Sequence, residues 1–540
     1  MTLLTDERAG QLASIDDDIV VVDEPRLRPP HARLVVATVA AGFIVMYVVV
    51  ALLRLRYPYE LEWIEGGMVN HVAQLRGGHH LYGPPSLRFT PDIYTPLYFA
   101  VSALVSFVSG TGYFTLRLVS FLSSLALFAA IGCLVHRETG DRAVAVVAVG
   151  LFAACYRIGG AWLDLAREDT LCLALLFWGL VVARDARTVR RAIGAGILLS
   201  LAFLTKQVAL VPAVGVGMYL LAVRRGRSTV AAYAAAVAVG IAGTSLVFDR
   251  LSDGWYGFYV WRLPSEHAVA TGSYLGFFTH DLLLPLAVAL GIAAAGLVAL
   301  HRRDRSAFWF HVLVGGALAA ASYSARLHTG GYDNVLLPAY GEVAVLFGIG
   351  VHRVVGVPGR AGVPRRRLLG VLAAIACLVQ FGRLVYDPAA QVPSRFDAEI
   401  GAETIAAIRA LPQPVYLPGH PWYLEQAGLP AGAQSAAIGD VLRAGGPEAR
   451  AMAGTLWDLV AARHFASIVV ESDVGYSYLP DNLCRYYEPA RPLLASGEVS
   501  YPVTGTFTGP AEVWLPRAVP DDRDCWAIGN WTIGLEGGAR

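Results

Sequence analysis

The chain has 540 residues, of which 55% are hydrophobic and 16% charged, and its mean hydropathy is +0.51. So apolar a composition excludes a soluble globular protein of this size and leaves a polytopic membrane protein as the class that fits. The formal net charge of +1 provides no general basic surface, so nucleic acid is not an expected partner.

Residues 1–33 form a polar, acidic segment with no apolar run before Leu34. A cleaved signal peptide needs such a run, so we predict a disordered cytoplasmic tail here. Arginine supplies 42 of the 43 basic residues, and Ala, Gly and Arg are used heavily, which is typical of bacteria with GC-rich genomes.

Residues 34–386 are predicted to be an all-α membrane module with about eleven transmembrane helices, because an apolar segment of about twenty residues crosses the bilayer as a helix. Residues 95–108 are apolar but too short, so we expect a re-entrant or interfacial helix there. The predicted spans are 34–53, 114–135, 143–161, 170–183, 192–204, 208–223, 229–248, 281–300, 307–324, 335–351 and 368–386.

Arginine-rich loops alternate along the chain with loops that are rich in aromatic residues, acids, Gly and Pro. Basic residues in short loops stay in the cytoplasm, so the alternation predicts the orientation. We expect a plasma-membrane protein with its N-terminus inside and everything after residue 386 outside. The arginine-rich loops are 137–142, 184–191, 224–227, 302–305 and 353–367.

Residues 388–540 are predicted to be a small extracytoplasmic α/β domain. Their patterns favour short buried strands, one amphipathic helix and a hairpin. Cys484 and Cys525 are the only cysteines outside the apolar runs, so we predict a disulfide between them. The expected strands are 415–417 and 468–470, the helix is 455–462, and the hairpin is 502–514.

The first outer loop carries three glutamates, Glu60, Glu62 and Glu65, near a membrane boundary. If this stretch is helical, Glu62 and Glu65 share one face, where repulsion and burial would raise one pKa toward that of a general base. We hypothesise that Glu65 is the base and Glu62 its supporting acid, because the glycines after Glu65 let the backbone approach substrate closely. The alternative is a solvated acidic loop.

The second outer loop contains Arg167 and Asp169, and the third consists of Thr205, Lys206 and Gln207. Arg167 could clamp a phosphate while an acid orients a sugar, or it could only anchor the loop at the interface. Lys206 is the only lysine in the chain, which indicates a site where a compact ammonium is needed and a planar guanidinium will not serve. Chance retention of one lysine is the alternative.

A later outer loop contains Arg326, Gly330, Gly331, Asp333 and Asn334. The glycines permit a tight turn, and Asp and Asn can hydrogen-bond sugar hydroxyls. Arg326 would add positive charge for a phosphate. An ordinary turn before a helix capped near Asp333 is the alternative.

These loops resemble those of the GT-C superfamily of polyprenyl-phosphate-sugar glycosyltransferases, near the protein O-mannosyltransferases and the lipid A aminoarabinose transferase, over roughly residues 34–386. The matching stretches are 62–66, 94–98, 167–169 and 206–207. Spaced glutamates replace the usual Asp-Glu pair, and Thr95 stands where proline is common. The resemblance implies that Tyr94 and Tyr98 belong to the sugar or acceptor site.

The resemblance implies transfer of a sugar from a polyprenyl-phosphate donor to an extracytoplasmic glycan, lipid or protein of the cell envelope. Inversion is expected, because no separate nucleophile is evident. Lys206, Arg167 and Arg326 would stabilise the leaving phosphate. No cofactor is indicated, although paired acids could bind a divalent metal. The alternative is a flippase for polyprenyl-linked sugars, which should show mid-span charges and internal repeats.

Overall fold

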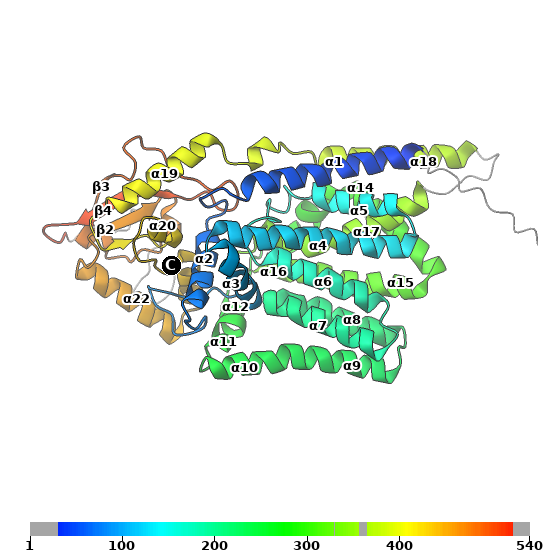
Figure 1. Cartoon of the computed structure of the whole chain (residues 1–540), viewed down its shortest axis with the longest axis horizontal. Coiled ribbons are helices and arrows are strands. Elements are labelled where there is room, and N and C mark those ends of the chain that lie inside the picture. The colour runs from blue at the N-terminus through cyan, green and yellow to red at the C-terminus, as the bar shows by residue number, and fades with distance from the viewer. Residues whose placement is uncertain (1–30, 329, 356–363, 522–540) are drawn as a thin grey trace, which may run out of the picture.

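The computed structural model describes residues 31–328, 330–355 and 364–521. A bundle of long helices joins a smaller α/β part at one end (Figure 1). The bundle helices are α1 (His31–Arg54), α4 (Tyr113–Thr139), α5 (Arg142–Ala154), α6 (Asp169–Arg184), α7 (Val189–Thr205), α8 (Leu210–Ala222), α9 (Arg227–Ala238), α10 (Thr244–Leu251), α14 (Leu284–Arg303), α15 (Arg305–Phe310), α16 (Gly316–Leu327), α17 (Leu337–Val354) and α18 (Pro364–Arg383).

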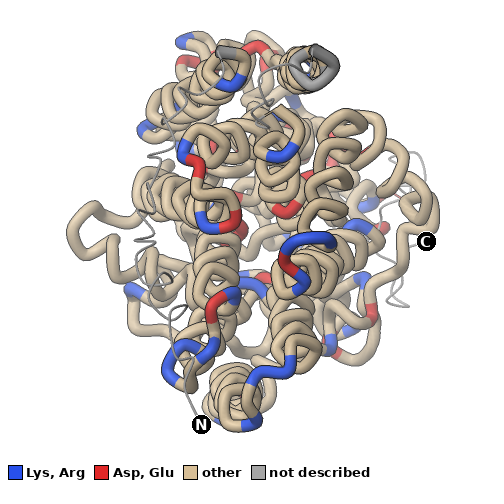
Figure 2. Tube along the Cα trace, turned by 90° about the vertical axis from the view of Figure 1, so that its right-hand side faces the viewer, with Lys and Arg blue, Asp and Glu red and all other residues tan. Residues whose placement is uncertain are grey.

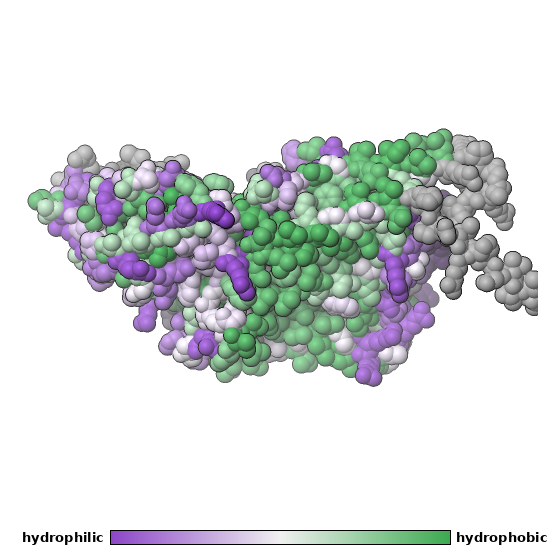
Figure 3. Space-filling view, turned by 45° about the horizontal axis from the view of Figure 1, so that its top comes forward, coloured by the Kyte–Doolittle hydropathy of each residue, from purple (hydrophilic) through white to green (hydrophobic). Residues whose placement is uncertain are grey.

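All eleven predicted spans overlap helices, and within the described ranges six helical stretches are long and apolar enough to cross a membrane. Others, such as α5, are shorter, so the count of eleven stays a prediction. On the face shown in Figure 3, apolar side chains cover the bundle between two hydrophilic ends. Such a surface fits a multi-pass membrane protein, because hydrocarbon covers the apolar side chains at no cost.

Arginines gather on the loops at the end of the bundle that lies away from the α/β part (Figure 2). Some are paired there: Arg184 Nε lies 2.6 Å from Glu138, and its Nη2 lies 3.0 Å from Asp304. The opposite end carries the outer loops and two further helices, α2 (Glu65–Arg76) and α3 (Leu97–Ser109). The arginine-rich loops therefore gather at one end of the bundle, and the side of the membrane that this end faces stays a prediction.

The span predicted over 143–161 is shorter than expected, because α5 ends at Ala154. Gly160 and Ala161 have φ of +79° and +54°, a left-handed conformation that no helix continues through. The chain turns back here, and the carbonyl of Ala161 accepts from Arg54 Nη2 at 3.3 Å. After this turn the second outer loop contacts the first, where the N–H of Ala166 donates to the Glu65 carboxylate.

The α/β part contains a four-stranded mixed sheet in the order β1-β2-β4-β3. Such a sheet agrees with the small α/β domain that the sequence predicted. β1 and β2 are parallel, and β4 is antiparallel to both β2 and β3. Its elements are β1 (Val415–Tyr416), β2 (Ser467–Glu471), β3 (Tyr487–Pro492), β4 (Pro510–Pro516), α19 (Arg395–Arg409), α20 (Pro421–Gln426), α21 (Ser435–Ala444), α22 (Gly446–Ala461) and α23 (Leu483–Tyr486).

The hairpin predicted over 502–514 is wrong, because only Pro510–Pro516 is a strand and its partners are β2 and β3. The polar groups of a residue that precedes β4 bond to the loops of the helix bundle instead. The Thr504 N–H donates to the carbonyl of Leu61 at 3.0 Å, and its hydroxyl donates to that of Gly160 at 2.6 Å. Cys484 is disulfide-bonded, and Cys525 lies outside the described residues.

The α/β part shares its core with the outer loops. One buried apolar cluster includes Met68 of α2, Tyr98 of α3, and Ile438 and Ile468 of the α/β part. Beside it, His420 lies between Glu60 of the first outer loop and Glu471 of β2, with its Nε2 3.0 Å from the Glu471 carboxylate. These two carboxylates outweigh the effect of burial and raise the pKa of His420 to about 10, so a charged imidazole joins the two parts.

Candidate active site

A cavity of about 730 Å³ lies where the outer loops meet the α/β part. Segments that are far apart in the sequence line it. They contribute Glu62, Trp63, Ile64, Asp92, Ile93 and Tyr94; Trp162 and Arg167; Lys206, Gln207, Val208 and Val211; Trp261, Pro264, Ser324, Ala325, His328, Gly330, Gly331, Tyr332, Asn334 and Val335; and Ala436, Asp440, Arg443, Asp473, Gly475, Tyr476, Tyr478, Gly505 and Thr506.

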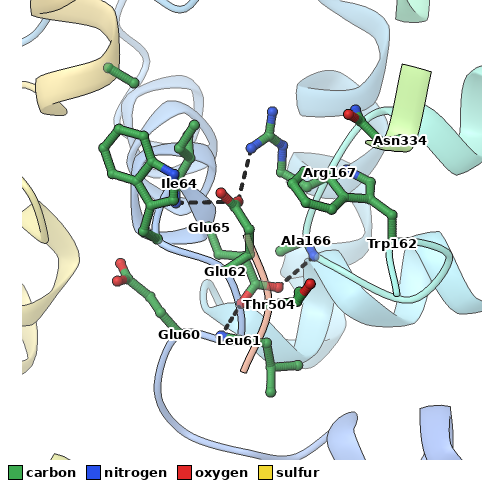
Figure 4. Close-up of polar contacts among 12 residues, drawn as sticks. Glu60, Leu61, Glu62, Ile64, Glu65, Trp162, Ala166, Arg167, Asn334 and Thr504 are labelled. Carbon is green, nitrogen blue, oxygen red and sulfur yellow. Dashed lines mark hydrogen bonds and ion pairs between the residues drawn. The ribbon is translucent and has the colours of Figure 1, made fainter. Parts of the chain in front are cut away.

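Glu62 and Arg167 lie next to each other on one wall of the cavity (Figure 4). Arg167 Nη1 donates to Glu62 Oε2 at 2.9 Å, and Nη2 donates to the Tyr94 hydroxyl at 2.9 Å. Burial raises the pKa of Glu62 to about 7, although Arg167 opposes the rise. Glu62 is therefore poised to exchange a proton near neutral pH.

Lys206 lies at the end of α7 with its ammonium between two carboxylates. Its Nζ is 2.8 Å from Glu168 and 2.6 Å from Asp169. Asn334 and Trp162 donate to the same Asp169 carboxylate at 3.0 and 2.9 Å. The lysine side chain remains 15% exposed, so its charge is open to the cavity while acids hold it in place.

Glu65 does not line the cavity, contrary to its hypothesised role as the base. Its carboxylate is fully buried and accepts from the backbone N–H groups of Leu61 and Ala166, both at 2.7 Å (Figure 4). Arg117 donates to both of its oxygens, at 3.0 and 2.5 Å. Burial favours the neutral form, but Arg117 and these donors outweigh it and lower the pKa of Glu65.

Four other predicted site residues, Tyr98, Asp169, Arg326 and Asp333, also lie outside the cavity lining. The Tyr98 hydroxyl donates to the carbonyl of Leu116 at 3.1 Å within the buried core. Arg326 forms ion pairs with Asp281 at 2.9 Å and with Asp333 at 3.2 Å. The Asp333 carboxylate is therefore already paired with an arginine. The structure thus brings together Glu62, Tyr94, Arg167, Asp169, Lys206 and Asn334, of which Asp169 contacts the cavity through Lys206 and Asn334.

The sequence analysis missed Asp92 and the whole wall from the α/β part. Asp440 and Arg443 of α21 and Tyr476 and Tyr478 after β2 line the cavity. The sequence did contain a signal for this wall. Residues 473–478 follow directly after a buried strand, and the carboxyl ends of strands in α/β sheets commonly carry binding residues. Within the described ranges no group of three or more His, Cys, Asp or Glu side chains is arranged to hold a metal ion.

The chain is similar to known membrane glycosyltransferases. The family model for dolichyl-phosphate-mannose-protein mannosyltransferases matches residues 93–248. Two crystal structures of ArnT from Cupriavidus metallidurans match with TM-scores of 0.52 and 0.50, 14% and 15% identity, and coverage of 74% and 75% of this chain and 86% of each ArnT chain. The first is bound to undecaprenyl phosphate and the second is in the apo state.

The archaeal oligosaccharyltransferase AglB from Archaeoglobus fulgidus matches with a TM-score of 0.43 and 14% identity, over 69% of this chain and 58% of AglB. A search of curated protein sequences finds no match. The likeness to ArnT shows that this chain has the fold of the GT-C glycosyltransferases.

The buried pair of Glu65 and Arg117 predicts a large effect on stability. Glu65→Gln should lower the free energy of unfolding by about 3–5 kcal/mol, because it leaves the Arg117 charge buried without a counter-ion. The thermal unfolding midpoint of the purified protein in detergent measures this. Glu498→Gln, at an exposed glutamate, is the matched control. An unchanged midpoint for Glu65→Gln would contradict the structural role.

Proposed function

We propose that the protein is a membrane glycosyltransferase that moves a sugar from a polyprenyl-phosphate donor to an acceptor outside the cytoplasm. The observation that carries the proposal is the pair of cations, Lys206 and Arg167, on the wall of a buried cavity at the end of the membrane bundle. Such cations suit a phosphate group. The family match and the undecaprenyl phosphate bound by ArnT support the same class of donor.

The donor phosphate would compete with carboxylates for both cations. When it takes Arg167, Glu62 loses the partner that now lowers its pKa, so Glu62 becomes a stronger base as the donor binds. Coupling of this kind raises the proton affinity of Glu62 when the donor is bound.

In the proposed reaction Glu62 takes the proton of the acceptor hydroxyl, whose oxygen attacks the anomeric carbon of the sugar. The bond from that carbon to the phosphate oxygen breaks, and its electron pair stays on the phosphate. Lys206 and Arg167 stabilise the added charge. A single displacement inverts the configuration at the anomeric carbon.

The wall from the α/β part is the proposed acceptor side, because the cations lie on the membrane side of the cavity. Asp440, Arg443 and Tyr476 offer charged, polar and aromatic surfaces there. Asn334 and Asp169 would contact the sugar from the lysine side. The acceptor is an envelope glycan, lipid or protein. A flippase is not favoured, since the cations Lys206 and Arg167 gather in one cavity at the end of the helix bundle.

The first prediction of this proposal concerns orientation. The arginine-rich end of the bundle should face the cytoplasm, so the α/β part and the cavity should lie outside. Alkaline phosphatase fused after Arg540 is expected to be active. Activity from a cytoplasmic reporter at that position, with inactive phosphatase, would reverse the orientation and remove the extracytoplasmic acceptor.

Glu62→Gln should reduce transfer by about 10²-fold to 10⁴-fold, because the amide keeps the size of the side chain and loses its proton affinity. The assay uses purified protein in nanodiscs, a panel of radiolabelled polyprenyl-phosphate sugars, and envelope fractions as acceptors. Glu498→Gln should transfer normally. Transfer by no wild-type combination would overturn the proposed function, whereas an active Glu62→Gln would overturn only the choice of base.

Lys206→Ala should reduce transfer by about 10²-fold to 10³-fold, since it removes a preorganised charge from the leaving group. Lys206→Arg should restore only part of the loss, because a planar guanidinium does not fit between Glu168 and Asp169 as the ammonium does. Arg450→Ala, at an exposed cation, is the control. Wild-type turnover in Lys206→Ala would exclude the lysine from the phosphate site.

A further inference from the structure

Asp92 differs from the other carboxylates near the cations of the cavity. It lies in the segment between α2 and α3, lines the cavity and is 4% exposed. Its Oδ2 atom has no hydrogen-bond donor among the residues that the structure describes. In contrast, Glu62 pairs with Arg167, and Glu168 pairs with Lys206. A buried carboxyl group at the cavity wall therefore has an oxygen that no described donor satisfies.

The nearest nitrogen belongs to His71, whose Nε2 lies 3.6 Å from Asp92 Oδ2. That nitrogen accepts the backbone N–H of Asp92 at 2.9 Å, and Nδ1 lies 2.7 Å from the carbonyl of Gly67, to which it must donate. Burial lowers the pKa of His71 to about 4, so the imidazole is neutral at physiological pH. His71 thus fixes the backbone of Asp92 and supplies no charge.

The ring of His71 is itself held in place by aromatic contacts. It stacks on Phe99, with ring centroids 4.7 Å apart, and meets Phe89 edge-on at 5.0 Å. Asp92 is therefore presented to the cavity from a rigid support, which is what a substrate contact requires.

The charges around Asp92 favour its neutral form. Burial is the largest influence and raises the pKa of Asp92 to about 8, although Arg167 lowers it. The carboxylates that raise it further are Asp440, Glu168 and Glu62, which lie on three different segments of the chain. At neutral pH the side chain is therefore mostly a carboxylic acid with an O–H group to donate.

We propose that Asp92 is a further substrate-binding residue, which donates a hydrogen bond in its acid form to the phosphate of the lipid-linked donor. This inference rests on the proposed function. Glu62, Glu168 and Asp169 already outnumber Arg167 and Lys206, so another negative charge would repel a phosphate. An O–H donor adds attraction without charge, and its hydrogen bond strengthens as the phosphate gains charge in the transition state.

The test is the pH dependence of binding of farnesyl methyl phosphate, a phosphodiester that carries one negative charge throughout the range used. Purified full-length protein in nanodiscs is titrated between pH 7 and pH 9.5. If the ligand needs the acid form, wild-type affinity should fall about tenfold by pH 9, because Asp92 must be protonated first. Asp92→Asn keeps a neutral donor, so its affinity should stay level and match that of the wild type at pH 7.

Two controls separate Asp92 from its neighbours. Glu62→Gln should keep the fall in affinity, which shows that Glu62 is not its source, and the exposed control Asp458→Asn should behave as wild type. Lys206 is not its source either, because Asp169 and Glu168 outweigh the effect of burial and raise the pKa of the ammonium.

Infrared difference spectra give a second readout that needs no ligand. The band of a protonated carboxyl group should disappear with a midpoint near pH 8 and should be missing in Asp92→Asn. Level wild-type affinity, or an equal fall in Asp92→Asn, would overturn the proposal. If Asp92→Asn does not fold, the wild-type curve and this band decide it. Absence of binding by wild type at every pH would overturn the proposed function and this inference with it.

Discussion

The buried ion pair between Glu65 and Arg117 is the constraint on which the site depends. Arg117 extends from α4, pairs with Glu65, and donates to the carbonyls of Tyr57 and Tyr59, both at 2.6 Å. Glu65 in turn accepts the N–H of Ala166 from the second outer loop. Two loops about one hundred residues apart are thereby fixed to one helix. Arg167, the next residue along, can reach Glu62 only because this pair sets the distance between the loops.

The α/β part completes the cavity by attaching to the same first loop. His420 bridges Glu60 and Glu471, and the Gln434 amide donates to the carbonyl of Trp63 at 2.8 Å. Removing one partner of a buried ion pair leaves the other charge without compensation, which is strongly destabilising. The α/β part and the first outer loop are therefore held in this one arrangement. It places α21 and the segment after β2 on one side of the cavity, beside the charges of the proposed site.

Apolar length predicted the helices, and the single lysine pointed to Lys206, because both signals lie in short stretches of sequence. The roles of the glutamates could not be read in that way. The equal-face argument for Glu62 and Glu65 assumed one helix, but α2 begins at Glu65, so Glu62 precedes it and points elsewhere. Asp92 and Tyr476 reach the cavity only through tertiary packing, and local patterns carry no record of which loop another loop will meet.

The carboxylates of the site are sorted by how many donors surround each. Glu65 accepts four hydrogen bonds and has no lone pair to spare, which suits a structural role. Glu62 accepts a hydrogen bond from one arginine, which a donor phosphate could displace. This suits the proposed base, whose proton affinity would rise when the donor binds. The Oδ2 atom of Asp92 has no hydrogen-bond donor among the described residues, which suits the proposed neutral donor. Three acids of similar intrinsic pKa thus acquire different proton affinities from their neighbours, and the proposed reaction, which binds an anion and deprotonates an alcohol at one site, needs that difference.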